Sequence, residues 1–221
     1  MKTPIEYIKE AGGIYTTKEN FIFFAKIMAV IIIVTTSLSY VFNYFYPVTT
    51  FENLDYSNTP MLIAFFLFSV LGFLVSLWSQ TTTYYAIFRK TESEKEVFKL
   101  GFKNMPKLFL VSIVVGLIIF LGMILLVIPA IIFAVWYSFS ILLVLDKGVG
   151  IGQALKQSKS MVSGRFWKIL GRSVVFGLFS FTIAIVFSLV PYAGNILVLF
   201  LSPLTLLPFY LLYKDLSINL E

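Results

Sequence analysis

Two long uncharged stretches constrain the fold of this chain more than any other feature. Leu108–Leu145 and Ser173–Tyr213 contain 38 and 41 residues without a single charge. A helix of that length would be about 57 Å long, whereas the hydrocarbon core of a bilayer is about 30 Å thick. Each stretch must therefore fold back on itself. We expect one turn at Val127–Ala130, which contains Pro129, and the other at Pro191–Asn195.

Two further apolar segments raise the expected number of membrane spans to six. The chain is 59% hydrophobic and only 13% charged, whereas soluble domains carry about 25% charged residues. The sequence therefore predicts an all-α, polytopic membrane protein, with a single membrane domain over residues 1–221 and six transmembrane helices arranged as three hairpins. The expected spans are residues 21–46, 60–88, 108–127, 130–145, 169–190 and 196–213.

The positive charges predict the topology of these spans. All 17 Lys and Arg residues lie outside the three expected outer loops, which are residues 47–59, 127–130 and 191–195. Short loops rich in Lys and Arg stay on the cytoplasmic side of a membrane. We therefore expect both chain termini to be cytoplasmic.

The inner segments have the pattern of amphipathic helices. We expect such helices at residues 4–16, 92–105 and 150–162, lying in the cytoplasmic interface because their polar faces carry Lys. Thr3 with Glu6, and Thr91 with Glu94, have the spacing of capping boxes. A Lys also lies at the inner end of each odd-numbered span, at Lys26, Lys107 and Lys168. Either three copies of one helix-plus-hairpin unit are present, or basic residues simply favour the inner ends of such spans.

The composition excludes several kinds of chemistry. The chain contains no Cys and no His, so disulfides, thiolate nucleophiles, the usual zinc and haem ligands and the commonest general base are absent. No nucleotide-binding or hydrolase motif occurs. We expect no enzyme activity, no cofactor and no metal site. The excess of Lys over Arg on one side of the membrane favours anionic lipid over nucleic acid as a partner.

Two groups of residues are candidate sites. Arg165, Lys168 and Arg172 lie at the start of the fifth span, where they either bind an anionic lipid headgroup or simply extend to the interface. The polar run Ser79–Thr83 in the second span either hydrogen-bonds between helices or lines a solute path. The residues proposed for that path are Gln80, Thr82, Pro203 and Pro208. The two prolines interrupt the sixth span, where they either form part of a site or give a passive kink.

The segment Leu125–Gly171 resembles a known family. It has a turn proline between two helices, an acidic residue and a glycine at the inner end, an Ala-Leu-x-x-Ser helix, and a glycine turn before Trp. The matching positions are Pro129, Asp146, Gly148, Ala154, Leu155, Ser158, Gly164, Trp167 and Gly171. This pattern is similar to the membrane domain of glycerophosphoryl diester phosphodiesterases and of related small bacterial membrane proteins, the YciC-like family. The resemblance implies a protein of the bacterial cytoplasmic membrane, here without a phosphodiesterase domain.

These observations lead to two functional expectations. The first is a non-enzymatic integral membrane protein that acts through lipid or protein contacts, in envelope or lipid homeostasis. The alternative is a transporter or permease for a small or amphipathic solute, which would pass Gln80 and the interrupted sixth span.

Overall fold

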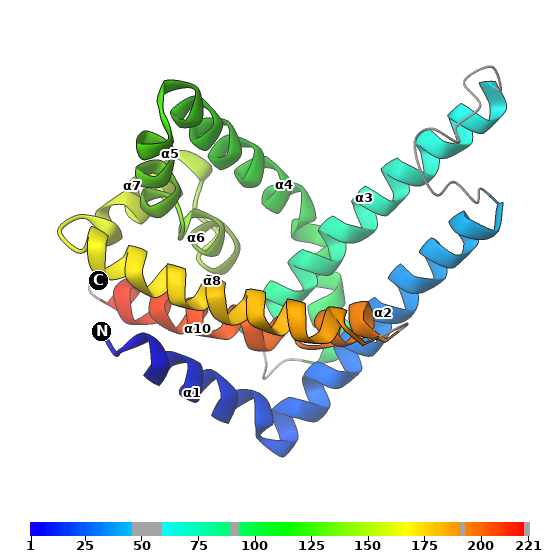
Figure 1. Ribbon diagram of the computed structural model, residues 1–221, viewed down its shortest axis with the longest axis horizontal. Helices are drawn as coiled ribbons and strands as arrows, with labels where there is room; N and C mark the ends of the chain where they lie inside the picture. The colour runs from blue at the N-terminus through cyan, green and yellow to red at the C-terminus, as the bar shows by residue number, and fades with distance from the viewer. Residues whose placement is uncertain (46–58, 89–92, 191–192, 219–221) are drawn as a thin grey trace.

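The computed structural model describes residues 1–45, 59–88, 93–190 and 193–218, and the regular structure within them is entirely helical (Figure 1). This confirms the expected all-α class. The helices are α1 (Pro4–Thr16), α2 (Lys18–Phe45), α3 (Thr59–Phe88), α4 (Glu94–Leu125), α5 (Val127–Trp136), α6 (Ser140–Asp146), α7 (Ile151–Val162), α8 (Phe166–Ser188), α9 (Gly194–Phe200) and α10 (Ser202–Ser217).

Six helical stretches in the described part of the chain are long and apolar enough to cross a membrane, as the sequence predicts. They are Lys18–Tyr44, Thr59–Phe88, Glu94–Leu125, Val127–Asp146, Phe166–Ser188 and Gly194–Ser217. Consecutive stretches pack on each other, because α2 contacts α3, α4 contacts α5 and α8 contacts α9. The expected outer loop at residues 47–59 lies almost wholly outside the described residues.

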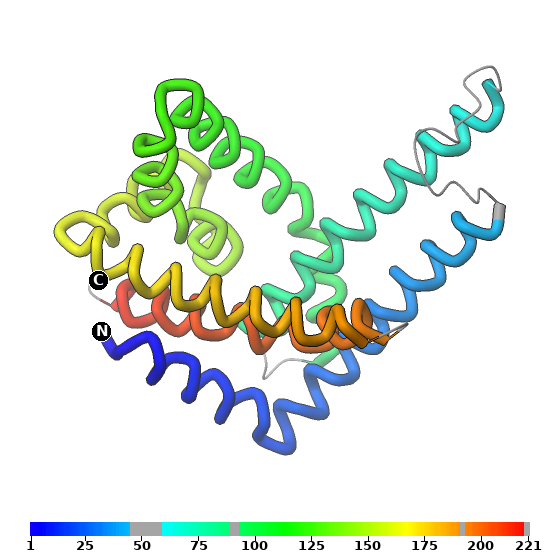
Figure 2. Tube along the Cα trace, viewed as in Figure 1, coloured from blue at the N-terminus to red at the C-terminus, as the bar shows by residue number. Residues whose placement is uncertain are grey.

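The paired helices diverge from a common base (Figure 1). The α2–α3 pair and the α4–α5 pair form two arms that point apart, and α8 runs beside α10 along the base with α1 beneath. The Cα trace in Figure 2 brings the start of α1 and the end of α10 close together on one side of the molecule. That placement agrees with an even number of spans.

The buried core lies at the end of the molecule that the charge pattern predicts to be cytoplasmic. Fully buried side chains come from the first half of α2 and from α1, α6, α7 and α10, with Tyr7, Phe24, Phe139 and Tyr213 among the largest. The opposite ends of the long helices expose large apolar side chains such as Leu121. Exposed apolar surface of this extent is typical of a protein whose solvent there is lipid.

The predicted capping box at the start of α1 is confirmed. The Glu6 backbone N–H donates to Thr3 Oγ1 at 3.3 Å, and the Thr3 backbone N–H donates to Glu6 Oε2 at 2.7 Å. The latter bond lowers the pKa of Glu6 below its usual value. Pro4 occupies the first helical position, where its missing N–H costs nothing. The cap fixes the register in which Tyr7, Ala11 and Tyr15 are buried on one face.

The expected separation between an amphipathic helix at 92–105 and a span at 108–127 is wrong, because α4 continues from Glu94 to Leu125. Pro106 lies inside the helix and removes one hydrogen bond, which would leave one carbonyl without its helical partner. This stretch is Lys-rich and Lys103 and Lys107 are exposed, so water can satisfy that carbonyl. The helical cap is Ser93, whose Oγ accepts from the Glu96 backbone N–H at 3.4 Å.

The capping box predicted for Thr91 and Glu94 is therefore wrong. Two Ser/Thr-x-x-Glu patterns overlap in this segment, Thr91 to Glu94 and Ser93 to Glu96. The second pattern supplies the cap, since α4 begins only at Glu94. Thr91 itself lies outside the described residues.

The turn between the third and fourth spans lies at Leu126, so its predicted position at Val127–Ala130 is wrong, because those residues form the first turn of α5. Only Leu126, in an extended conformation, separates α4 from α5. Pro129 lies in the first turn of α5, where backbone N–H groups have no helical partner. Gly122 permits this close return, because a Cβ there would lie 2.7 Å from Phe133 Cδ2 and 3.0 Å from the Ala130 backbone.

The fourth and sixth candidate spans each consist of two helices. α5 ends at Trp136 and α6 begins at Ser140, a break that the sequence did not predict. The sixth stretch breaks at Leu201, and Pro203 lies in the first turn of the new helix α10, which begins at Ser202. The predicted interruption is thus confirmed at Pro203, whereas Pro208 lies inside α10, where it removes a helix hydrogen bond without ending the helix. The expected turn at Pro191–Asn195 falls partly outside the described residues.

Candidate functional site

Helix α7 carries a basic surface whose position is fixed by two glycine turns. Gly148 and Gly164 have φ values of 67° and 74°, in the left-handed region that favours glycine. Between these turns α7 spans Ile151–Val162, close to the predicted residues 150–162. It buries the apolar face that the sequence indicated, including Ala154 and Met161. The opposite face, with Lys156 and Lys159, remains exposed.

The segment from Lys147 to Arg172 contains six basic residues and no acidic residue. Elsewhere on the predicted inner side, three lysines pair with carboxylates. Such ion pairs join Lys2 to Glu10 at 2.7 Å, Lys26 to Glu94 at 2.9 Å and Lys99 to Glu96 at 3.7 Å. The α7–α8 segment therefore carries positive charge that its own sequence does not neutralise. We call the side chains of Lys156, Lys159, Arg165 and Lys168 the α7–α8 basic surface.

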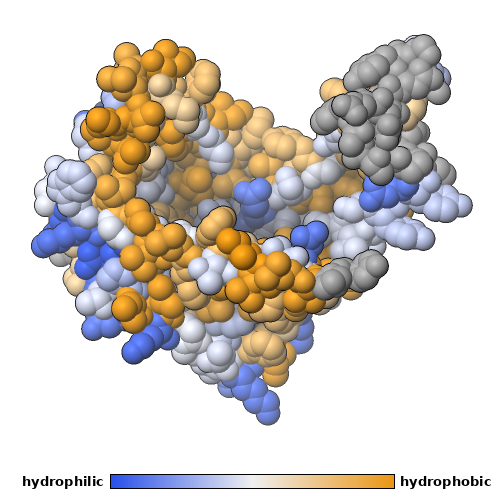
Figure 3. Space-filling model, viewed as in Figure 1, coloured by the Kyte–Doolittle hydropathy of each residue, from blue (hydrophilic) through white to orange (hydrophobic). Residues whose placement is uncertain are grey.

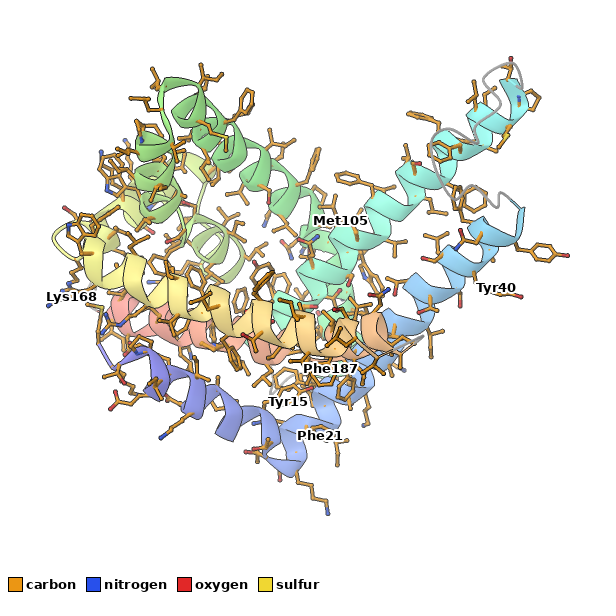
Figure 4. The ribbon with its side chains drawn as sticks, viewed as in Figure 1. Tyr15, Phe21, Tyr40, Met105, Lys168 and Phe187 are labelled. Atoms are coloured by element: carbon orange, nitrogen blue, oxygen red, sulfur yellow. The ribbon has the colours of Figure 1, made fainter. Side chains whose placement is uncertain are left out.

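The predicted cluster of Arg165, Lys168 and Arg172 is divided by the structure. Arg172 Nε and Nη2 both donate to the Lys2 backbone carbonyl, at 3.0 Å and 2.6 Å, and Nη1 donates to the Lys168 carbonyl at 2.8 Å. Lys168 is exposed at the first turn of α8 (Figure 4). Arg172 therefore ties α8 to the N-terminal segment, with three of its N–H donors already used by backbone carbonyls.

This contact belongs to a network that joins α1, α8 and α10. The Lys2 backbone N–H donates to the Tyr7 hydroxyl at 3.2 Å, and that hydroxyl donates to Asp215 Oδ2 at 2.6 Å. Burial, together with the bond to Asp215, raises the pKa of Tyr7 to about 12. Tyr7 therefore stays protonated at neutral pH and keeps its donor. Sequence analysis missed Tyr7 and Asp215 because they are 208 residues apart.

An apolar groove lies between α5 and α8, beside the α7–α8 basic surface. Its volume is about 630 Å³, and its lining consists of Ile128, Ile131, Ile132, Trp136, Phe166, Trp167 and Leu170. The Lys159 ammonium lies 4.2 Å from the centroid of the Trp136 ring, a cation–π contact. The Trp167 side chain is 78% exposed. A cation and two indoles thus lie around one end of an otherwise aliphatic groove.

The predicted polar path is realised only in part. Gln80 lines a cavity of about 200 Å³ between α3 and the break of the sixth span, together with Ser79, Thr83, Tyr84, Leu199, Ser202 and Leu206. The structure thus brings Gln80 to the interrupted span, as expected. Thr82 does not line the cavity. It is fully buried against α4, where its Oγ1 has no hydrogen-bond partner among the described residues. Pro203 and Pro208 are buried and outside the lining.

Several positions of the family-like segment have structural roles. Asp146 Oδ2 accepts from the Tyr213 hydroxyl at 3.1 Å, which joins α6 to α10. Ser158 donates to the Trp136 carbonyl at 2.7 Å and accepts from the Phe139 backbone N–H at 3.2 Å. Ser158 therefore satisfies backbone groups exposed by the break between α5 and α6. These positions hold the fold of the segment.

No group of three or more His, Cys, Asp or Glu residues that could hold a metal ion occurs in the described part of the chain. Comparisons of the chain with protein-family models, with curated proteins and with solved structures find no match. The resemblance of Leu125–Gly171 to the phosphodiesterase membrane domain stays a prediction. What the structure establishes is that the regular structure of the described residues is helical and includes six stretches long and apolar enough to cross a membrane.

Proposed function

We propose that this protein is a non-enzymatic, multi-pass protein of the bacterial cytoplasmic membrane that binds anionic lipid on its inner side, in envelope or lipid homeostasis. In this proposal the helix pairs insert as three hairpins, both termini are cytoplasmic, and α1 and α7 lie in the interface. The observation that carries the proposal is the run from Lys147 to Arg172, with six basic and no acidic residues.

The physical basis is attraction between exposed cations and anionic headgroups. Each Lys or Arg near a negatively charged leaflet contributes about 1 kcal/mol of attraction. The α7–α8 basic surface offers four such side chains, of which Arg165 is half-buried and the three lysines are exposed, whereas the four exposed lysines of α4 share their helix with Glu94 and Glu96. Arg172 is excluded from the count because its guanidinium holds the N-terminal segment.

Native mass spectrometry of the protein released from mixed vesicles of phosphatidylglycerol and phosphatidylethanolamine tests this proposal. We expect the wild-type protein to retain phosphatidylglycerol selectively. The quadruple variant with Lys156, Lys159, Arg165 and Lys168 each changed to Gln should lose that selectivity.

The matched control changes Lys95, Lys99, Lys103 and Lys107 on α4 to Gln, which removes the same charge. This control should keep its phosphatidylglycerol. Equal losses in both variants would mean that net charge alone attracts the lipid, and unchanged retention in both would refute the proposal.

A second function, passage of a small polar solute, is favoured by the cavity at Gln80. Hydroxyl and amide groups of Ser79, Gln80 and Ser202 meet there across α3 and α10, and polar groups deep in a membrane domain are default candidates for a substrate path. With glycerol as the probe, stopped-flow light scattering of proteoliposomes should show permeability above that of protein-free vesicles.

The variant Gln80→Leu should abolish most of this protein-dependent glycerol permeability, because it removes the amide from the cavity. Gln153→Leu, on the exposed face of α7, is the control and should leave it unchanged. Permeability that survives Gln80→Leu would exclude the cavity as the path.

A further inference from the structure

The α5–α8 groove has two unlike ends. On the α5 wall, Ile128, Ile131 and Ile132 lie at helical spacing on one face, and Trp136 follows at the end of α5. On the α8 wall, Phe166, Trp167 and Leu170 face them. The groove therefore passes from an aromatic end beside Lys159 to a purely aliphatic end. In Figure 3 the hydrophobic colouring is dense over the upper-left arm, which α4 and α5 form.

The length of the groove matches one leaflet of a bilayer. Ile128 and Trp136 are eight helical steps apart, or about 12 Å along the axis of α5. Half of a hydrocarbon core about 30 Å thick is about 15 Å. An acyl chain lying in the groove would thus run along α5 between Trp136 and Ile128, over about 12 Å.

The charge at the aromatic end selects among possible occupants. Lys159 is held over Trp136 at 4.2 Å from the ring centroid, and no carboxylate occurs between Lys147 and Arg172. A neutral amphiphile gains nothing from that cation. A second copy of this chain, related by a twofold axis through the groove, would bring the same basic surfaces towards each other, which is unfavourable.

We propose that the α5–α8 groove binds one acyl chain of an anionic phospholipid whose headgroup contacts Lys159. This inference rests on the proposed lipid-binding function and assigns it a site. The apolar side chains of the two walls pack against the acyl chain, and the Lys159 ammonium pairs with the phosphate. Trp167 covers the entrance from the side of α8.

Tryptophan fluorescence can test the site directly, because the chain has only three Trp residues. The reporter protein keeps Trp136 and carries Trp78→Phe and Trp167→Phe. It is placed in phosphatidylcholine vesicles that contain a minor fraction of lipid brominated in the upper half of its chains, which quenches nearby indoles. A second protein keeps only Trp78, which stacks on Phe98 far along the sequence from the groove.

We expect brominated phosphatidylglycerol to quench Trp136 more strongly than the same fraction of brominated phosphatidylcholine, whereas Trp78 should respond equally to both. Lys159→Gln should remove most of the preference. Leu170→Phe narrows the groove and should also abolish it. The same substitution at Leu178, two turns further along α8 and 59% exposed, should leave the preference intact.

Three results would overturn the site. Equal quenching of Trp136 by both lipids would mean that ordinary bulk lipid covers the groove. Absence of quenching by either lipid would mean that protein covers it. A preference that survives Leu170→Phe would place the lipid outside the groove. If native mass spectrometry still shows retained phosphatidylglycerol in any of these cases, only the groove is refuted, and the lipid-binding function stands.

Discussion

Gly101→Ala should destabilise the protein markedly, whereas Gly116→Ala on the same helix should not. Gly101 lies where α4 crosses α3, and a Cβ at this position would clash with Thr82 Oγ1 and lie 3.0 Å from Thr82 Cα. Neither atom can move away easily, because Thr82 is fully buried and part of its contact is backbone. A Cβ at Gly116 would meet no atom within 4 Å.

The expected loss for Gly101→Ala is about 2 kcal/mol, since overpacking a tight contact costs roughly 1–3 kcal/mol. The replacement of Gly by Ala in a helix favours folding by up to about 1 kcal/mol, so Gly116→Ala should be neutral or slightly stabilising. Unfolding in detergent, followed by circular dichroism against temperature or added SDS, measures both. Similar unfolding curves for the two variants would contradict the close crossing of α3 and α4.

Thr82→Ala provides a second check on the same crossing. In the Gly101→Ala background it removes the clashing hydroxyl but leaves the close backbone contact. Part of the lost stability should therefore return, which is the non-additivity expected of two residues in contact.

The spans could be predicted from the sequence because each needs about 20 apolar residues to cross a bilayer, and because Lys and Arg residues gather in the segments between them. The predicted spans 21–46 and 60–88 match α2 and α3 to within three residues. Helix contacts could not be predicted in this way. Glycines suit close helix contacts, and of Gly72, Gly116, Gly122 and Gly177 only Gly122 lies in one, at the α4–α5 turn, whereas a Cβ at the other three would meet nothing within 4 Å. A close contact depends on where two helices cross, which residue size alone does not determine.

The candidate sites also depend on contacts between residues that lie far apart in the sequence. Arg172 could not be assigned from spacing, because its acceptor is the carbonyl of Lys2, 170 residues away. Thr82, in contrast, could have been separated from Gln80. Residues two apart on a helix point about 200° apart, so these two side chains cannot line one cavity. The structure places Gln80 in the cavity and Thr82 against α4.

The Ser158 hydroxyl explains how a fourth span can break in two within the membrane domain. The break after Trp136 frees a backbone carbonyl at Trp136 and a backbone N–H at Phe139, and Phe139 is fully buried. The Ser158 hydroxyl donates to the first and accepts from the second. One buried side chain of α7 thus replaces two helical hydrogen bonds, and it joins α7 to the break.

Ser158→Ala should therefore destabilise the protein by about 2–4 kcal/mol, because each buried polar group left without a partner costs roughly 1–3 kcal/mol. Ser160→Ala, on the exposed side of the same helix, is the matched control and should change stability little. Unfolding in detergent measures the loss, and the emission of a protein that keeps only Trp136 reports the break itself. If Ser158→Ala unfolds like Ser160→Ala, then water must reach the two backbone groups, and the break is not held by α7.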